Sequence, residues 1–255
     1  MKSLQFSALA ALAAKQAMGH ATFQDLWVNG VDKINVTSND LRCNANPGTA
    51  SGNCAVAAGD VVTVEMHQQP GDRSCDNEAL GGAHYGPVMV YLTAVDDAAA
   101  ADGSTGWYKI YQDSWAKNPS GGSGDDDFWG SKDMNTCCGL VDVKIPEDTP
   151  AGDYLLRAEV IALHTAGGEG GAQLYMTCFQ LTVDGSGSSK PETVLFPGAY
   201  SSSDPGILVD IHSSLDSYVA PGPDVIESGT VREAGSDCTG CEATCTAGAA
   251  AAPTA

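Results

Sequence analysis

Histidine is the residue type whose placement in this chain most directly indicates chemistry. The sequence contains five histidines, and two of them, His20 and His84, have a local context that favours metal binding. A cut after Gly19 would leave His20 with a free α-amine as well as its imidazole. Two nitrogens on one residue can close a chelate ring around a metal ion, so His20 at the start of a processed chain is a candidate ligand.

His84 lies in the glycine-rich segment 81–87 (GGAHYGP), directly before an apolar run that starts at Val88. Glycine lets backbone segments approach closely, and a ligand at the start of a rigid strand is well positioned. A turn histidine is the simpler interpretation of His84 alone. Combined with the amine and imidazole of His20, however, it supplies three neutral nitrogens in a T-shaped arrangement, and tetragonal nitrogen ligation is typical of Cu(II).

The apolar run that begins at Gln173 adds polar groups to this constellation. Residues two apart on a strand face the same side, about 7 Å apart, so Gln173 and Tyr175 can point into one site. Tyr175 would lie axial to the metal, with Gln173 beside it as a hydrogen-bond donor. His164 precedes the run by a glycine-rich connection, residues 165–172, which is consistent with a hairpin and brings His164 near the metal. The alternatives are a core aromatic for Tyr175 and a buried polar pair for Gln173 and His164.

The first nineteen residues have the pattern of a secretory signal peptide. Lys2 precedes an apolar run at residues 4–14, and Ala17 and Gly19 form an A-x-A-like cleavage site. The run is shorter than the ~20 apolar residues that span a bilayer, and no later stretch reaches that length. We therefore predict a secreted, extracellular protein. Its expected parts are a leader (1–19), a folded domain (20–230) and a low-complexity tail (231–255).

The charge of the chain limits its partners. The formal net charge is −20, and the predicted leader contains Lys2 and Lys15 but no acidic residue, so its removal makes the balance more negative. Binding to nucleic acid or to an anionic membrane depends on basic patches, and we therefore expect neither partner. A neutral polysaccharide imposes no such requirement.

The distribution of apolar residues predicts an all-β fold. Short runs rich in β-branched and aromatic residues are separated by clusters of Pro, Gly, Asp and Ser, and no long helical stripe is present. We expect an antiparallel β-sandwich of the immunoglobulin-like or fibronectin-like type with long loops. The predicted strands are 61–66, 88–95, 107–112, 141–145, 154–163, 173–183 and 207–211.

Three further features concern loops and cysteines. Asn35 begins the sequence Asn-Val-Thr, an N-glycosylation acceptor that predicts an exposed loop. Residues 118–130 (NPSGGSGDDDFWG) lack the alternating acidic ligands of a calcium loop, which favours a solvated acidic loop. The nine cysteines are in an oxidising compartment if the protein is secreted, but the sequence alone does not fix their pairing. Those before the tail are Cys43, Cys54, Cys75, Cys137, Cys138 and Cys178.

Several motifs in a fixed order resemble a known family, the fungal lytic polysaccharide monooxygenases of auxiliary activity family nine, formerly glycoside hydrolase family sixty-one. The resemblance extends from His20 to about Gly229. The matching segments are 20–24 (HATFQ), 26–32 (LWVNGVD), 82–92 (GAHYGPVMVYL), 152–164 (GDYLLRAEVIALH), 171–178 (GAQLYMTC), 204–211 (DPGILVDI) and 218–223 (YVAPGP).

The resemblance implies a catalytic copper β-sandwich domain with a flat substrate-binding face. One copper ion would be held by the amine and imidazole of His20 and by His84, with Tyr175 axial. His164 and Gln173 match the pair that positions and protonates the oxygen species. Tyr218 matches an aromatic residue that stacks on a glucose ring; from its local context alone it is a loop tyrosine.

The family's reaction is oxidative cleavage of β-1,4-glucan chains such as cellulose, using O2 or H2O2. The resemblance implies an external reductant, such as a small phenol or a secreted electron-transfer dehydrogenase, and a monomeric enzyme. Oxidation at C1 is favoured over C4. We expect no cellulose-binding module of the kind that some relatives carry after the linker.

The resemblance also implies a disulfide between Cys54 and Cys178. One departure concerns the segment between the Val-Asn-Gly-Val-Asp motif and Leu41-Arg42-Cys43, which relatives usually have in a longer form. Only residues 33–40 fill it here, which affects a substrate-contacting loop and leaves the partner of Cys43 open.

Two other functions compete with the oxidative one. A glycoside hydrolase would need two carboxylates about 5 to 9.5 Å apart across a cleft, and no carboxylates in the sequence form a set as coherent as the histidines. A secreted copper-binding or cellulose-binding protein without turnover would not need Tyr175, Gln173 and His164 around the metal.

Overall fold

The structure is a computed structural model that describes residues 27–28, 31–32, 35–45, 52–69 and 73–236. His20, the predicted leader and the tail beyond residue 236 lie outside the described residues. In the described ranges, no helix is long and apolar enough to cross a membrane. The longest helix is α1 (Gly130–Thr136), which has 7 residues.

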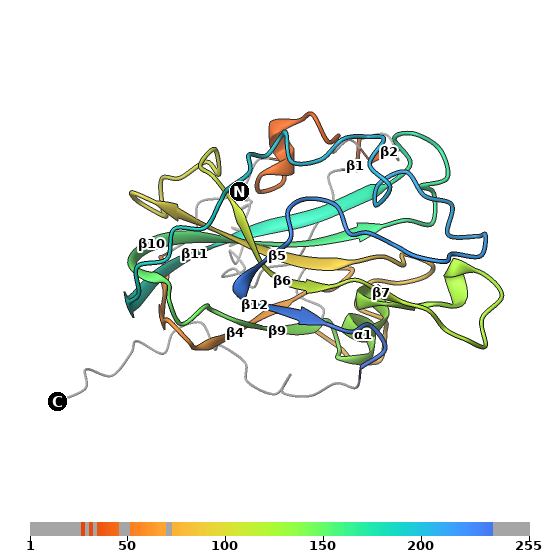
Figure 1. Cartoon of the computed structure of the whole chain (residues 1–255), viewed down its shortest axis with the longest axis horizontal. Coiled ribbons are helices and arrows are strands. Elements are labelled where there is room, and N and C mark those ends of the chain that lie inside the picture. Colours follow the sequence, from red (N-terminus) through yellow and green to blue (C-terminus); the bar gives the residue numbers. More distant parts are fainter. Residues whose placement is uncertain (1–26, 29–30, 33–34, 46–51, 70–72, 237–255) are drawn as a thin grey trace, which may run out of the picture.

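A six-stranded sheet forms the main layer of the molecule (Figure 1). Its strand order is β12-β6-β5-β10-β11-β3. The central pairings β6·β5, β5·β10 and β10·β11 are antiparallel, whereas the edge strands β3 and β12 pair in parallel with β11 and β6. The strands are β3 (Cys54–Ala57), β5 (Val88–Val95), β6 (Tyr108–Asp113), β10 (Pro150–Ala162), β11 (Gln173–Ser186) and β12 (Val225–Arg232).

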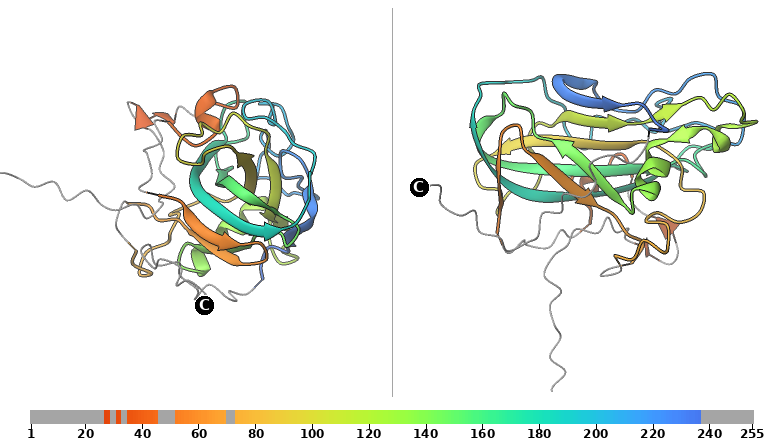
Figure 2. Two further views of the ribbon diagram at one scale, coloured as in Figure 1. Left: turned by 90° about the vertical axis from the view of Figure 1, so that its left-hand side faces the viewer. Right: turned by 90° about the horizontal axis from the view of Figure 1, so that it is seen from below.

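A two-stranded antiparallel sheet of β4 (Val61–Glu65) and β9 (Leu140–Lys144) covers one face of the main sheet. In the end-on view of Figure 2 the strands surround a common interior. Two short antiparallel pairs complete the fold: β1 (Trp27–Val28) with β2 (Val31–Asp32), and β7 (Trp115–Ala116) with β8 (Phe128–Trp129). The remaining helices are η1 (Asn39–Leu41) and η2 (Gly124–Asp126).

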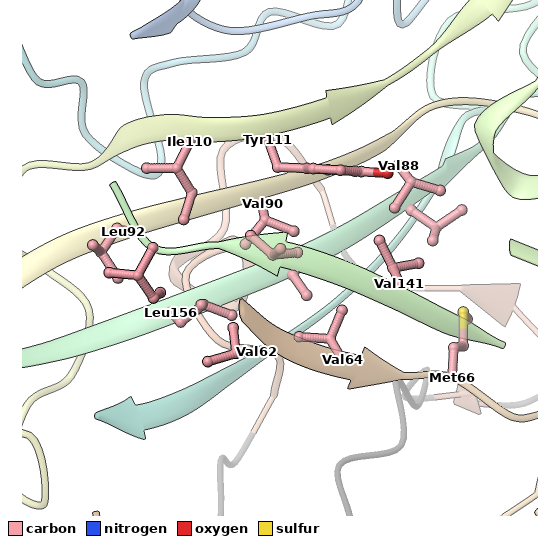
Figure 3. Packing of buried hydrophobic residues seen from close by; sticks show 14 of the residues in the cluster. Val62, Val64, Met66, Val88, Val90, Leu92, Ile110, Tyr111, Val141 and Leu156 are labelled. Carbon is pink, nitrogen blue, oxygen red and sulfur yellow. The ribbon is translucent and has the colours of Figure 1, made fainter. Parts of the chain in front are cut away.

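The central strands are buried on both faces, because side chains alternate between two cores. Val88, Val90 and Leu92 of β5 point toward β4 and β9 (Figure 3), while Met89 and Tyr91 belong to a second core on the other face. Burial of both faces explains the continuous apolar run of β5, which strands exposed on one face lack. The second core is covered by η1 and by long loops that include residues from 196 to 211.

The predicted all-β sandwich is confirmed, and the predicted strand 88–95 coincides with β5. The prediction of a strand at 207–211 is wrong. Ile207 and Ile211 are buried, but the backbone N–H groups of Ile207 and Leu208 both donate to the Asp204 oxygen. The apolar residues therefore anchor a turn onto the second core, and no neighbouring strand pairs with them.

The loop 118–130 is less solvated than predicted. The side chain of Asp127 is fully buried, where it accepts hydrogen bonds from the Trp115 indole at 3.0 Å and the Asn118 backbone at 3.0 Å. Asp126 accepts from the backbone N–H of Gly122 and Ser123. The acidic residues therefore organise the loop internally. In contrast, Asn35 lies in an exposed turn, as predicted, where its side chain accepts from Thr37.

The predicted disulfide between Cys54 and Cys178 is wrong, because Cys178 is bonded to Cys43 with a Cα separation of 5.0 Å. The parallel pairing of β3 with β11 places Cys54 opposite Leu181, three residues beyond Cys178. Three strand residues span about 10 Å, which exceeds the ~7 Å that a disulfide bridges. A second disulfide joins Cys75 to Cys138.

A pair of carboxyl groups is buried where β6 meets α1. Asp113 is 2% exposed, and burial, followed by the charge of Asp133, raises its pKa to about 7. Arg232 acts in the opposite direction from 3.8 Å. The folded state therefore holds this proton more tightly than the unfolded chain, whose aspartates titrate near ~4.

Asp113→Asn should stabilise the protein at pH 8 and have little effect at pH 4. A raised folded-state pKa means that the contribution of Asp113 to stability falls as the pH rises from about 4 to about 7 and is lost above that range. Each pKa unit corresponds to about 1.4 kcal/mol, so the gain at pH 8 should be on the order of a few kcal/mol. Urea unfolding at pH 4 and pH 8 measures the change in the free energy of unfolding. An equal change at both pH values would contradict the raised pKa of Asp113.

Candidate metal centre

The loop that carries His84 is fixed between β5 and the end of β10. Gly86 exchanges hydrogen bonds with Ser131, whose hydroxyl is 3.0 Å from the Gly86 nitrogen. A Cβ atom at Gly86 would lie 1.8 Å from the Ile161 oxygen, so only glycine permits this approach. The Leu163 N–H donates to the Tyr85 oxygen. His84 and His164, which follows Leu163, are consequently neighbours.

The orientation of the His84 ring is set by a backbone carbonyl. Its Nδ1 lies 2.5 Å from the Gly81 oxygen, and because a carbonyl only accepts, Nδ1 carries the hydrogen. The lone pair is then on Nε2, which is the nitrogen left to face a ligand. Carbonyl contacts of this kind fix the tautomer of metal-binding histidines. The Gly81 turn is itself held by Glu78, which accepts from the Gly82 N–H at 3.0 Å.

The predicted hairpin between His164 and Gln173 is present. Ala162, the last residue of β10, pairs with Gln173, the first of β11. The connection is closed by Thr165, whose hydroxyl donates to the Gly171 oxygen at 2.5 Å. His164 follows β10 directly and therefore lies beside the start of β11.

Three polar side chains form a connected row at this end of the hairpin. The hydroxyl of Tyr175 donates to Oε1 of Gln173 at 2.6 Å. This contact assigns the other side of the Gln173 amide as NH2, which lies 3.4 Å from Nε2 of His164. His164 accepts there, so its hydrogen is on Nδ1, a buried atom with no hydrogen-bond partner among the described residues.

The row faces His84. The ring centroids of His84 and His164 are 4.4 Å apart, and those of His84 and Tyr175 are 6.0 Å apart. Partial burial, followed by the positive charge that His84 and His212 can carry, holds the pKa of His164 below its usual value. His164 therefore favours its neutral form, which can take up a proton.

These side chains fit a copper ion as far as the described residues extend. As donors they offer the imidazole of His84, with an oriented lone pair, and the phenol of Tyr175, and an imidazole suits copper better than magnesium or calcium. The other predicted ligand, His20, lies outside the described residues. Within those residues no group of three or more His, Cys, Asp or Glu side chains could hold a metal, so the imidazole of His84 needs further donors.

Tyr218 lies away from this row and is half-buried. Its ring packs edge-on against Trp129, with centroids 4.9 Å apart, and its hydroxyl donates to the Gly206 oxygen at 2.9 Å. The next residue, Val219, is 65% exposed. The hydroxyl therefore ties two loops together, and only part of the ring is open to a sugar.

His212 belongs to the site, although sequence reasoning assigned it no role. Its Nε2 lies 2.8 Å from the backbone oxygen of His164. It comes from a turn without a strand pattern, and its two partners, Asp125 and His164, are 87 and 48 residues away. No local signal in the sequence distinguishes it from a surface histidine. The remaining described histidine, His67, is buried elsewhere and contacts Glu65 at 2.8 Å.

Comparison with known proteins shows what this chain is similar to. The model of Auxiliary Activity family 9 (formerly GH61) matches residues 20–218. AA9 family lytic polysaccharide monooxygenase B of Thermothelomyces thermophilus is 63% identical over 262 residues, which covers 97% of this chain and 81% of that protein. AA9 family lytic polysaccharide monooxygenase E of Malbranchea cinnamomea is 60% identical over 250 residues, which covers 92% of this chain and 96% of that protein.

Solved structures are similar as well. The extended catalytic domain of LPMO9A of H. jecorina is 30% identical with a TM-score of 0.63, and the comparison covers 80% of this chain and 77% of that one. A structure titled HiLPMO9B is 32% identical with a TM-score of 0.64, covering 82% and 89%.

Proposed function

The chain belongs to Auxiliary Activity family 9, whose members are copper-dependent oxidoreductases that cleave polysaccharides, and we propose that it oxidises cellulose chains at C1. The single observation that carries the oxidative function is the row of Tyr175, Gln173 and His164, which faces His84 at one end of the sandwich. A protein that only stores copper has no need of it.

Copper would be held by the amine and imidazole of His20 in the mature chain, by Nε2 of His84 and by the phenol of Tyr175. One ion per chain is expected. When bound and supplied with electrons, copper provides the activation of O2 or H2O2 and the removal of a hydrogen atom from the sugar. The Gly81 carbonyl orients His84 before any metal arrives.

The polar row manages protons beside that position. Gln173 holds Nε2 of His164 and the hydroxyl of Tyr175 at the same time, so the three side chains keep one arrangement. Neutral His164 would first take up a proton from solvent and would then, as the imidazolium, pass it to an oxygen species held beside His84. Gln173 is the positioning group, and His164 is the proton donor.

The substrate is expected to be cellulose or a related β-1,4-glucan. A neutral polymer avoids repulsion by the negative charge of the protein. The part of the Tyr218 ring that remains open would contact a glucose unit, with Trp129 behind it. The preference for C1 over C4 comes from overall similarity of the sequence to its relatives.

The organisation of the chain follows from the same proposal. The signal peptide (1–19) would be removed in secretion, the catalytic domain would comprise residues 20–230, and the tail (231–255) would contain no folded module. The enzyme would act outside the cell as a monomer, with electrons from a small phenol or a secreted electron-transfer dehydrogenase. Asn35 would carry the glycan.

Product analysis tests the function. The copper-loaded protein beginning at His20 should release aldonic acids from cellulose in the presence of ascorbate, seen by mass spectrometry, and EDTA should stop the release. Ketoaldoses in their place would move the attack to C4. Ordinary reducing-end sugars that form despite EDTA would indicate a hydrolase, and copper binding without oxidised products would indicate a binding protein.

A further inference from the structure

His212 is exposed, yet both nitrogens of its ring have partners at the candidate site. Nδ1 lies 2.7 Å from Oδ2 of Asp125, and Nε2 lies 2.8 Å from the backbone oxygen of His164. A carboxylate and a carbonyl are acceptors only. Both ring nitrogens must therefore carry hydrogen, so the two contacts together require the imidazolium form of His212.

The two contacts join three segments that are distant in sequence. Asp125 belongs to η2, His164 to the β10–β11 connection and His212 to the turn after Asp204–Ile211. Backbone hydrogen bonds link the same segments in pairs, from Asp125 N to Ile211 O at 2.9 Å and from Val209 N to Ala166 O at 2.9 Å. The imidazolium ring is the side chain that contacts both other segments at once.

We propose that His212 is a positioning residue for His164: as a cation it donates to Asp125 and to the His164 carbonyl, and so holds the His164 ring beside His84. The inference rests on the proposed function of His164. A neutral imidazole has one N–H and can keep only one of the two bonds, so deprotonation of His212 breaks either its bond to Asp125 or its bond to the His164 carbonyl.

The charges around His212 favour the cation. The hydrogen bond to Asp125, followed by that to the His164 carbonyl, raises the pKa of His212 above its usual value. Asp210 on the same turn acts in the same direction. The neighbouring cations are engaged with other groups: Lys132 donates to the Asp125 and Asp127 carbonyl oxygens, and Lys117 contacts Ser214 at 3.5 Å.

The sign of the pH dependence follows from this shift. Below the raised pKa of His212 both contacts are present, and as the pH rises through that value one contact is lost. The His164 turn should therefore loosen at alkaline pH. A side chain that is permanently charged should remove the dependence.

Nuclear magnetic resonance of the metal-free protein tests the contacts without any reference to activity. At pH 6 both ring nitrogens of His212 should carry protons, and the backbone carbonyl carbon of His164 should change its shift at the pH where His212 titrates. Asp125→Asn should lower that pH. A single protonated ring nitrogen at pH 6, or a His164 carbonyl that does not respond, would overturn the proposal even if the enzyme cleaves cellulose.

Two variants connect the contacts to catalysis. His212→Gln removes the cation and should lower kcat by about 10-fold below the pKa of His212, the cost typical of an outer partner of a metal site, with little change in KM. The ratio of the wild-type kcat to the kcat of His212→Gln should fall toward one as the pH rises through that pKa. Above it the wild type also lacks one of the two hydrogen bonds of His212.

His212→Arg is the matched conservative variant. The side chain of His212 is 59% exposed, so a guanidinium has room, and its several N–H groups can donate to Asp125 and to the His164 carbonyl. His212→Arg should have most of the wild-type activity, and it should keep this activity above the pKa of His212, where the activity of the wild type declines. Equal activity of the Gln and Arg variants across the pH range, with intact folding, would overturn a positioning role.

Discussion

Replacing His84 with alanine should abolish tight copper binding and polysaccharide cleavage together while the fold remains intact. His84 is half-buried in a loop whose shape depends on Gly86 and Ser131, so loss of the imidazole leaves the loop in place. The change removes a proposed direct ligand. Outer partners of a metal site cost 10- to 100-fold, and we therefore expect a loss of more than about 100-fold in both copper affinity and cleavage.

His67→Gln is the control for removal of a histidine. His67 contacts Glu65, which is also held by Arg73 at 2.7 Å, and it has no part in the proposed site. Calorimetry should show one copper ion per chain bound to this variant with the affinity of the wild type. If His84→Ala bound copper and cleaved cellulose as the wild type does, the site assignment would be wrong.

The second large expected effect concerns an ion pair buried in the second core. Arg157 and Glu159 lie two apart on β10, both fully buried on the face of the second core. Their side chains form a bidentate pair with two bonds of 2.8 Å. Burial lowers the pKa of Arg157, but the Glu159 carboxylate raises it by more. Tyr200 donates to the same carboxylate at 2.5 Å.

Arg157 also ties the segment that carries Cys43 to the sheet. Its Nε donates to the carbonyl oxygens of Leu41 and Arg42 at 3.0 Å each. The guanidinium lies 4.2 Å from the centroid of the Phe196 ring. The side chain therefore fills the space between η1 and β10 and satisfies acceptors on both.

Arg157→Met should destabilise the protein by about 3–5 kcal/mol, because it leaves the Glu159 carboxylate buried without its partner. For a domain of this size the melting temperature should fall by about 6–20 °C. Calorimetry measures the change.

The double replacement Arg157→Met with Glu159→Leu separates charge from packing. It removes the stranded carboxylate, so it should be more stable than the single variant even though Leu41 and Arg42 still lose a donor. A double variant less stable than the single one would show that the stranded Glu159 carboxylate is not what destabilises Arg157→Met, and that its contact with Tyr200 is worth more than its burial costs.

The sequence predicts the central strands and the row of polar residues well, because local patterns determine both. β5 is a continuous apolar run because it is buried on both faces, and such a run is recognised as a strand from the sequence. The neighbourhood of His164 and Gln173 follows from a hairpin whose loop needs glycine, since a Cβ at Gly171 would lie 1.8 Å from the Thr165 oxygen.

The features that the sequence does not predict depend on distant contacts. The register of β3 against β11 excludes Cys54 as the partner of Cys178, and the segment that Arg157 ties to β10 brings Cys43 there instead; no spacing in the sequence reveals either. Both edge strands, β3 and β12, were absent from the predicted set; their side chains are mostly exposed or half-buried, so they lack a clear apolar pattern. His212 acquires its contacts only when three loops converge.

The central claim is that the α-amine of His20 is a copper ligand, and blocking that amine tests it most directly. A Gly/Ser-rich extension before His20 converts the amine to an amide and moves the new terminus away from the site. Copper titration followed by product analysis should show one tightly bound ion and oxidised sugars for the chain beginning at His20, with both lost in the extended chain and recovered when a protease removes the extension. Equal copper affinity and equal release of oxidised sugars by the extended chain would contradict the account.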